Sequence, residues 1–122
     1  MRVHEVVGLL LRGMAVEYRK STVDSLKAGD AEMDVKGVAL TFLATQDVLE
    51  RSLALGANLV ITHEPIYYNH PDETDWLAGD AVYEAKKRFL KEKGLSVWRI
   101  HDTIHDWKRD GIVQGMMEQL GW

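Results

Sequence analysis

His63 and Glu64 follow a short apolar run, residues 59 to 62, and precede Pro65. The run is rich in β-branched residues, which is typical of a strand buried on both faces of a parallel sheet. Proline cannot donate a ladder hydrogen bond and restricts the residue before it to extended conformations, so the strand is predicted to end here. Ligands bind at this rim of such sheets, and imidazole and carboxylate both bind divalent metals. Because a His-Glu pair is also common by chance, it does not establish a site alone.

A second group of metal-binding residue types follows another apolar run, residues 95 to 100. It contains His101, Asp102, His105 and Asp106 within six positions. On a helical turn the two histidines, four apart, would share a face, whereas in an extended loop they would not, and the sequence leaves both open. Asp102 or Asp106 can orient an imidazole by accepting its other N–H, although Asp102 can equally serve only to cap the loop.

Hydrophobic periodicity predicts the elements that must position these residues. The predicted helices are Val3–Met14, Thr45 to Gly56, about Ala78 to Lys93, and Ile112 to Gly121. The predicted core strands are Val35–Phe42, Leu59–Thr62 and Leu95–Ile100. Residues 17 to 34 are predicted to be a long connection. Alternation of helices and strands predicts an α/β fold with a parallel or mostly parallel sheet, joined by right-handed helical crossovers. The carboxyl ends of its strands would share one edge, so His63 and Glu64 would meet His101 and His105 there.

Composition restricts the function classes. The 122 residues, 46% hydrophobic and 28% charged, predict one α/β domain over residues 1 to 122. A formal net charge of -4 gives no basic footprint, which disfavours nucleic acid as a partner. Zero cysteines exclude disulfides and thiolate metal sites. The longest apolar run near the start, VVGLLL, is too short for a membrane span, so no membrane association and a cytoplasmic location are expected.

Three segments together resemble a known family. They are GVALTFLATQDVLERSLALGANLVITHEP, VWRIHDTIHDW and the terminal LGW, and they are similar to the amino-terminal half of the Nif-three-like dinuclear-metal family, also called GTP cyclohydrolase I type 2 homologues. The similarity extends from about Val23 onward. Family members carry two adjacent histidines where this chain has His63 and Glu64, and a histidine followed four residues later by an aspartate where it has His101 and His105. Relative to that pattern, Glu64 puts a carboxylate in place of an imidazole, and His105 puts an imidazole in place of a carboxylate. The site is therefore expected to survive in altered form.

The resemblance implies a Nif-three-like fold and a metal site. Its ligands would be His63, Glu64 and His105, with His101 as ligand or support, holding one or two divalent transition-metal ions such as zinc, iron or manganese. It also implies a homo-oligomer, a toroidal hexamer in the family, and a small-molecule substrate that the sequence does not identify. Family chains supply a further histidine and glutamate to the metals from a second half. Residues 1 to 122 are therefore expected to match the amino-terminal half. The ligands of the second half would have to be replaced in another way, for instance by oligomerisation. His70 is expected in a surface loop.

Two function classes follow from this resemblance. The first is a metal-dependent hydrolase, in which a bound ion lowers the pKa of water to about 7; its catalytic residues are not identified. The alternative is a noncatalytic metal-handling or regulatory interaction protein. A folded fragment without activity is a third interpretation. No glycine-rich phosphate loop of the P-loop type is present in the sequence.

Overall fold

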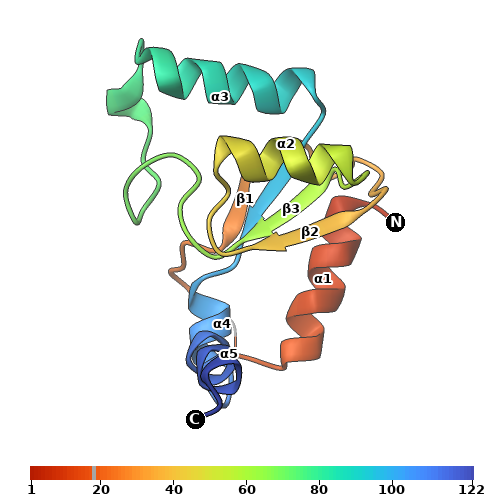
Figure 1. The fold of residues 1–122 in the computed structure, drawn as a ribbon, viewed down its shortest axis with the longest axis vertical. Helices are drawn as coiled ribbons and strands as arrows, with labels where there is room; N and C mark the ends of the chain where they lie inside the picture. The colour runs from red at the N-terminus through yellow and green to blue at the C-terminus, as the bar shows by residue number, and fades with distance from the viewer. Residues whose placement is uncertain (18) are drawn as a thin grey trace.

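The computed structural model describes residues 1–17 and 19–122 and contains a four-stranded sheet with helices on both faces (Figure 1). In chain order the elements are α1 (Val3–Met14), β1 (Ser25–Ala28), β2 (Val38–Thr41), α2 (Gln46–Ala54), β3 (Leu59–Thr62), the 3-10 helix η1 (Asp75–Leu77), α3 (Ala81–Glu92), β4 (Ser96–Arg99), α4 (Asp102–Asp106) and α5 (Gly111–Leu120). None of the helices in the described part of the chain is long and apolar enough to cross a membrane.

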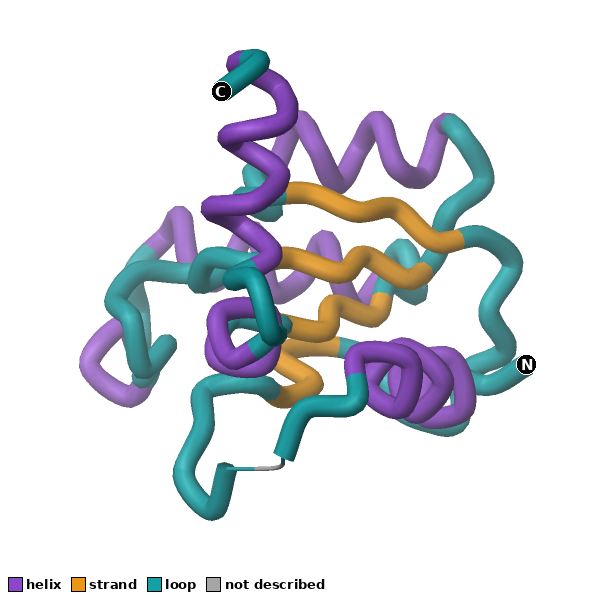
Figure 2. The backbone as a smooth tube through the Cα atoms, turned by 90° about the horizontal axis from the view of Figure 1, so that it is seen from below, coloured by secondary structure: helices purple, strands orange, loops and turns teal. Residues whose placement is uncertain are grey.

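The sheet has the strand order β1-β4-β3-β2, and its strands lie side by side (Figure 2). Strands β2, β3 and β4 are parallel, with Leu59 opposite both Val38 and Ser96. The predicted α/β fold with a mostly parallel sheet is therefore confirmed. Because the three strands are parallel, their carboxyl ends share one edge of the sheet, and this is the edge at which His63 and His101 follow their strands.

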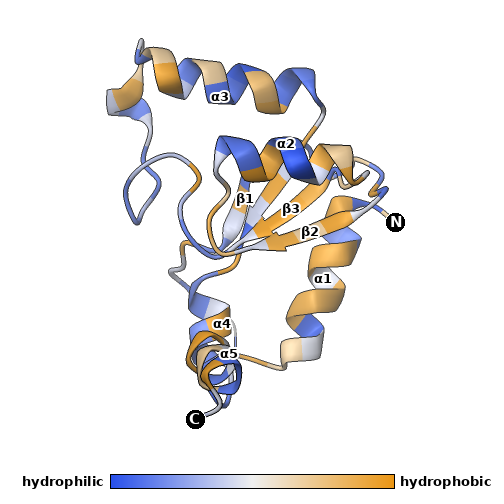
Figure 3. Cartoon of the chain, viewed as in Figure 1, coloured by the Kyte–Doolittle hydropathy of each residue, from blue (hydrophilic) through white to orange (hydrophobic). Residues whose placement is uncertain are grey.

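Side chains of β3 point alternately into two hydrophobic clusters. Val60 packs on one face with Leu49 of α2 and Leu90 of α3, whereas Leu59 and Ile61 pack on the other face with α1. All four residues of β3 are buried, as predicted for a strand covered on both faces. Figure 3 shows hydrophobic residues along the strands and along α1. The sheet is thus a rigid central layer whose rim can hold side chains in fixed positions.

Helices α2 and α3 each begin after a residue whose side chain caps the helix. The hydroxyl of Thr45 accepts a hydrogen bond from the N–H of Val48 at 3.3 Å, and the carboxylate of Asp80 accepts from the N–H groups of Val82 and Tyr83. These bonds satisfy N–H groups that have no partner within the helix. The helices predicted around residues 45–56 and 78–93 are confirmed as α2 and α3, with ends shifted by a few residues.

Residues 17 to 34 were predicted to be a connection, and that prediction was wrong at β1. Ser25–Ala28 forms an antiparallel strand whose Ser25 lies opposite Arg99 of β4. The four residues Ser-Leu-Lys-Ala alternate polar and apolar side chains, but the segment is short and Leu26 is its one large apolar residue, so the pattern is too weak to predict a strand. The strand forms because the free edge of β4 offers backbone partners, which is a tertiary effect.

Strand β2 is shorter than predicted and lies at the edge of the sheet. Its Val38 and Leu40 are 45% and 76% exposed, so the prediction of a core strand was wrong in that respect. The apolar stripe of the last predicted helix also favours a core position for Met116 and Met117, but in α5 these residues are 51% and 41% exposed. An apolar composition does not distinguish a central strand or buried helix face from one at the periphery.

Candidate metal centre

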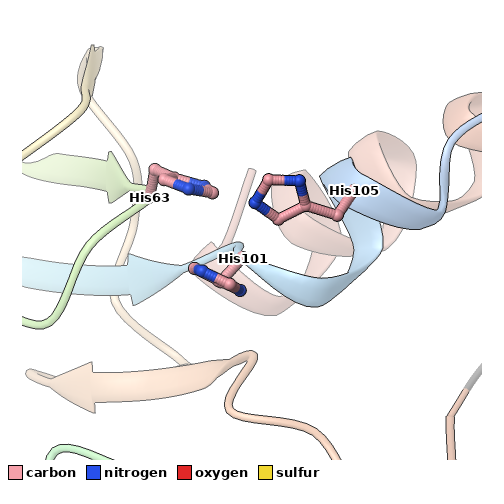
Figure 4. A group of neighbouring side chains, drawn as sticks. All are labelled: His63, His101 and His105. Carbon is pink, nitrogen blue, oxygen red and sulfur yellow. The ribbon is translucent and has the colours of Figure 1, made fainter. Parts of the chain in front are cut away.

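Three imidazole rings meet at the carboxyl edge of the sheet. His63 follows β3, His101 follows β4, and His105 lies in α4, and Figure 4 shows the three rings grouped together. Their ring centroids are 4.5 Å apart for His63 and His101, 5.0 Å for His63 and His105, and 4.8 Å for His101 and His105. One ring nitrogen from each of the three lies within 4.8 Å of the others. The expectation that the parallel sheet brings these histidines together is confirmed.

Helix α4 determines how the second and third rings are placed. It begins directly after β4, with His101 as its N-cap residue, and the N–H of His105 donates to the carbonyl of His101 at 3.3 Å. The two histidines are therefore one helical turn apart, which resolves the alternatives that the sequence left open. Because residues four apart share a helix face, both rings reach the ring of His63.

Each of the three rings uses its Nδ1 atom in a hydrogen bond to an oxygen. The acceptors are the carbonyl of Ile100 for His63 at 3.3 Å, the carboxylate of Asp102 for His101 at 3.1 Å, and the carboxylate of Asp110 for His105 at 2.9 Å. Because a carbonyl or ionised carboxylate can only accept, the proton of a neutral ring resides on Nδ1. The lone pair of Nε2 is then available in all three rings, which is the arrangement found in metal-binding histidines.

His63 is the buried member of the cluster, with 5% of its surface exposed. Burial lowers its pKa, and the charges of His101 and His105 lower it further, against the opposing effects of the Ile100 carbonyl and Glu64. Its ring is therefore neutral at pH 7, and neutral imidazole is the form that binds metals.

Asp102 is one of the two carboxylates that the sequence offered for orienting an imidazole, and its Oδ1 atom lies 3.1 Å from Nδ1 of His101. Burial opposes its ionisation, but hydrogen bonds from Thr22, His101 and Val23 and the charge of Arg19 lower its pKa to about 2. It is ionised at pH 7 and oriented toward His101. Asp106 does not play the role that the sequence offered it, because its carboxylate accepts hydrogen bonds from Arg19 instead.

Asp24 is a supporting residue that the sequence reasoning missed. Its carboxylate accepts hydrogen bonds from the N–H groups of His101 at 2.6 Å, Asp102 at 2.9 Å and Thr103 at 2.9 Å. It thus caps the start of α4 from a distant segment and fixes the backbone that carries His101. No local signal marks it, because the contact joins residues 77 to 79 positions apart.

Replacing Asp24 by alanine is expected to loosen the start of α4. The free energy of unfolding should fall by about 2 kcal/mol, since a capping carboxylate is lost. If the cluster binds metal, its affinity should fall by about 10-fold to 100-fold, as is typical when a supporting residue is removed. Urea denaturation and metal titration measure the two effects. Asp34→Ala, at an exposed aspartate, is the matched control, and equal metal affinities for the two variants would contradict the supporting role.

Asp110 was also missed. One oxygen of its carboxylate accepts from the ring of His105, and the other accepts from the N–H groups of Ile112 and Val113 at the start of α5. An aspartate before Gly111 at the start of a predicted helix is a recognisable capping signal, which could have identified this position. Its contact with His105 depends on the turn between α4 and α5.

Glu64 lies at the rim of the cluster. Its Oε1 atom is 3.9 Å from Nε2 of His63, and its Oε2 atom is 3.9 Å from a guanidinium nitrogen of Arg99. The side chain is 32% exposed. The four residues predicted as ligands are therefore neighbours, with the three imidazoles forming the compact group and Glu64 beside His63.

Arg99 connects the site to the sheet. Its side chain is fully buried, and it donates hydrogen bonds to the carbonyls of His63, at 3.0 Å, and His70. Burial lowers the pKa of Arg99, and the carboxylates of Asp72 and Glu64 oppose this effect. The guanidinium thus ties the end of β3 to the loop that follows it.

His70 lies in an exposed loop, as expected, yet its ring reaches the site. Its centroid is 4.6 Å from that of His101, and together with Asp102 these residues form a second group of closely spaced ligand atoms. The guanidinium of Arg99 lies 3.3 Å from Nδ1 of His70. Because a guanidinium only donates, this nitrogen of His70 is engaged as an acceptor.

The donor set determines which kind of group the site fits. Three imidazoles, each with an oxygen acceptor at Nδ1, and an adjacent carboxylate suit a divalent transition metal such as zinc, iron or manganese. An α/β domain with such side chains at the carboxyl edge of its parallel strands defines the class of the protein. The chain belongs to the Duf34/NIF3 (NGG1p interacting factor 3) family, whose model matches residues 1–122. The family resemblance seen in the sequence is thereby confirmed.

Two curated relatives support this assignment. A "GTP cyclohydrolase 1 type 2 homolog" from Clostridium acetobutylicum is 26% identical over 80% of this chain and 35% of its own length. A protein of the same name from Clostridium perfringens is 24% identical over 100% of this chain and 45% of its own length. The chain thus spans less than half the length of these curated relatives.

Solved structures share the fold. A Bacillus cereus protein related to NIF3 matches with a TM-score of 0.68 and 21% identity over 85% of this chain and 28% of that chain. Reduced HcgD from Methanocaldococcus jannaschii matches with a TM-score of 0.66 and 15% identity over 93% of this chain and 46% of that chain. At identities of 21% and 15%, these similarities show a shared fold.

Proposed function

We propose that this chain is a metal-binding member of the Duf34/NIF3 family. His63, His101 and His105 would hold a divalent transition metal, zinc, iron or manganese, with Glu64 as a further ligand. The observation that carries the proposal is that all three imidazoles use Nδ1 in hydrogen bonds, which leaves each Nε2 available, and that one ring nitrogen of each lies within 4.8 Å of the others. Coincidental histidine neighbours have no reason to be oriented in this way.

The proposal extends to the assembly that completes the site. The chain spans 35% and 45% of two curated relatives, and we propose that residues 1 to 122 correspond to their amino-terminal half. Three imidazoles and one carboxylate would hold one ion per chain. A second ion would then need ligands from another copy in a homo-oligomer, for which the hexamer suggested by the family resemblance is the expected form.

Metal-dependent hydrolysis of a small molecule is the activity that this donor set favours. A bound divalent ion supplies Lewis acidity and makes water more acidic. The chain itself would hold the ion through its imidazoles, while Asp102 and Asp110 keep the rings of His101 and His105 oriented. The alternative, a metal-handling or regulatory protein without turnover, would use the same ligands.

A metal titration followed by an activity assay separates these alternatives. Protein treated with EDTA is titrated with zinc, manganese, iron(II) and cobalt, and each metal-loaded form is incubated with GTP, the nucleotide in the names of the relatives. Binding with metal-dependent release of product supports the hydrolase, binding without release of product supports metal handling, and the absence of any binding isotherm contradicts both.

Glu64 and His105 are expected to behave as a coupled pair. If they replace a histidine and an aspartate of other family members, Glu64→His alone leaves too little negative charge, and His105→Asp alone adds a second carboxylate beside Glu64. The double variant should recover the metal affinity that each single change loses. Residues that share one centre couple by about 0.5 to 3 kcal/mol, which a double-mutant cycle on metal affinity measures. Additive effects would mean that the two residues serve separate centres.

A further inference from the structure

A cavity of about 700 Å³ lies away from the histidine cluster, between β1, α3 and the loop before η1. Its lining includes Gly94, Leu95 and Ser96 at the beginning of β4, whereas the histidine cluster follows the end of that strand. Its volume is within the usual range of small-molecule sites. The proposed metal function does not use this cavity.

Three lysines line this cavity, namely Lys27, Lys87 and Lys91. Lys27 lies at the irregularity in the pairing of β1 with β4, where the register shifts between Leu26 and Ala28. Lys87 and Lys91 are four apart in α3 and therefore share a helix face. Within residues 1–17 and 19–122, none of these ammonium groups lies within 4.0 Å of a carboxylate oxygen.

The two carboxylates that line the cavity are engaged by backbone groups. Asp72 accepts hydrogen bonds from the N–H groups of Ile66 at 3.0 Å, Tyr67 at 3.0 Å and Tyr68 at 3.4 Å. Asp30 accepts from the N–H of Glu32 at 2.8 Å. The three ammonium groups of the lining outnumber its two carboxylates, so the cavity carries a net positive charge (three minus two), which favours an anion.

Two aromatic rings form part of the wall. Tyr67 and Tyr83 are in edge-to-face contact with centroids 4.8 Å apart, and the ammonium of Lys87 lies 5.4 Å from the centroid of the Tyr83 ring. Burial raises the pKa of Tyr67 to about 12, so its hydroxyl remains neutral and can donate a hydrogen bond. Leu90 and Leu95 add apolar surface. Such a wall suits a flat ring next to the cationic side.

We propose that this cavity binds a small molecule in which an aromatic ring is joined to a phosphate group. A phosphate monoester offers three strong acceptor oxygens, one for each ammonium group, whereas a carboxylate offers two. The ring would lie against Tyr67 and Tyr83, and the phosphate would lie among Lys27, Lys87 and Lys91. This site is independent of the metal centre.

Phenyl phosphate is a direct probe of this proposal, with inorganic phosphate and phenol as its two halves. Calorimetric titration of the EDTA-treated chain at pH 8 should give saturable binding of one phenyl phosphate per chain, at least about tenfold tighter than either half, because both parts of the cavity then contribute. The double variant Lys87→Gln/Lys91→Gln should weaken binding about tenfold or more, since charge-assisted hydrogen bonds are lost.

Two controls make the experiment decisive. Lys93→Gln removes a lysine at the end of α3 that does not line the cavity, and His63→Ala alters the metal centre; both should bind phenyl phosphate as the unchanged chain does. Equal affinities for phenyl phosphate and inorganic phosphate would overturn the proposal as adventitious anion binding. Full affinity in the double lysine variant, or loss of affinity in His63→Ala, would overturn it as well.

Discussion

The His63→Ala variant is expected to purify without bound metal. It removes the proposed ligand that is buried, and the two remaining imidazoles belong to the N-cap and the body of the short helix α4. Loss of a residue that only supports a ligand typically costs 10-fold to 100-fold in metal affinity, so loss of a ligand itself should cost at least about 100-fold. Elemental analysis of purified protein and titration of EDTA-treated protein measure this effect.

Two companion variants distinguish a lost ligand from a damaged fold. His105→Ala removes a ring that is 35% exposed, so it should reduce metal binding to a similar degree with little loss of folding stability. His4→Ala removes an exposed histidine of α1 and should leave metal binding unchanged. If His4→Ala and His63→Ala retained the same metal content, the proposed centre would be refuted.

Arg99→Met is expected to lower the free energy of unfolding by about 3 to 5 kcal/mol. The guanidinium is fully buried and donates to the carbonyls of His63 and His70, so its removal leaves both acceptors without this donor. It also removes the positive charge 3.9 Å from Glu64. Removing one partner of a buried, hydrogen-bonded polar interaction typically lowers the free energy of unfolding by about this amount.

Urea denaturation followed by circular dichroism measures this loss. Arg88→Met is the matched control, because Arg88 is an exposed residue of α3, and it should change stability by no more than about 0.5 kcal/mol. Similar midpoints for Arg99→Met and Arg88→Met would show that the buried guanidinium does not stabilise the end of β3.

The sequence predicted those parts of the fold that depend on local periodicity and capping. Strand β3 is an uninterrupted apolar run, and α2 begins at the capping residue Thr45, so both were found within a few residues. Strand β1 was not found, because its pairing with β4 depends on backbone groups that only the assembled sheet presents. The position of β2 at the edge was likewise not visible in its apolar composition.

The site was predictable to the extent that the order of the elements fixes it. Parallel strands place their carboxyl ends together, which predicted that His63 would meet His101 and His105. The supporting residues were harder to predict, because Asp24 contacts His101 across 77 positions and the contact of Asp110 with His105 depends on a turn. The proximity of His70 to His101 arises from the path of the loop after Pro65, which no sequence period determines.

Nitrogen NMR of the histidine rings during zinc titration is the most direct test of the central claim. In EDTA-treated protein at pH 7 the Nε2 atom of His63 should give the signal of an unprotonated nitrogen, because burial lowers the pKa of this ring. On addition of one equivalent of zinc, the Nε2 signals of His63, His101 and His105 should move together to the range of metal-bound nitrogen, while those of His4 stay in place. Zinc that left all three Nε2 signals unchanged, or moved only that of His4, would contradict the account.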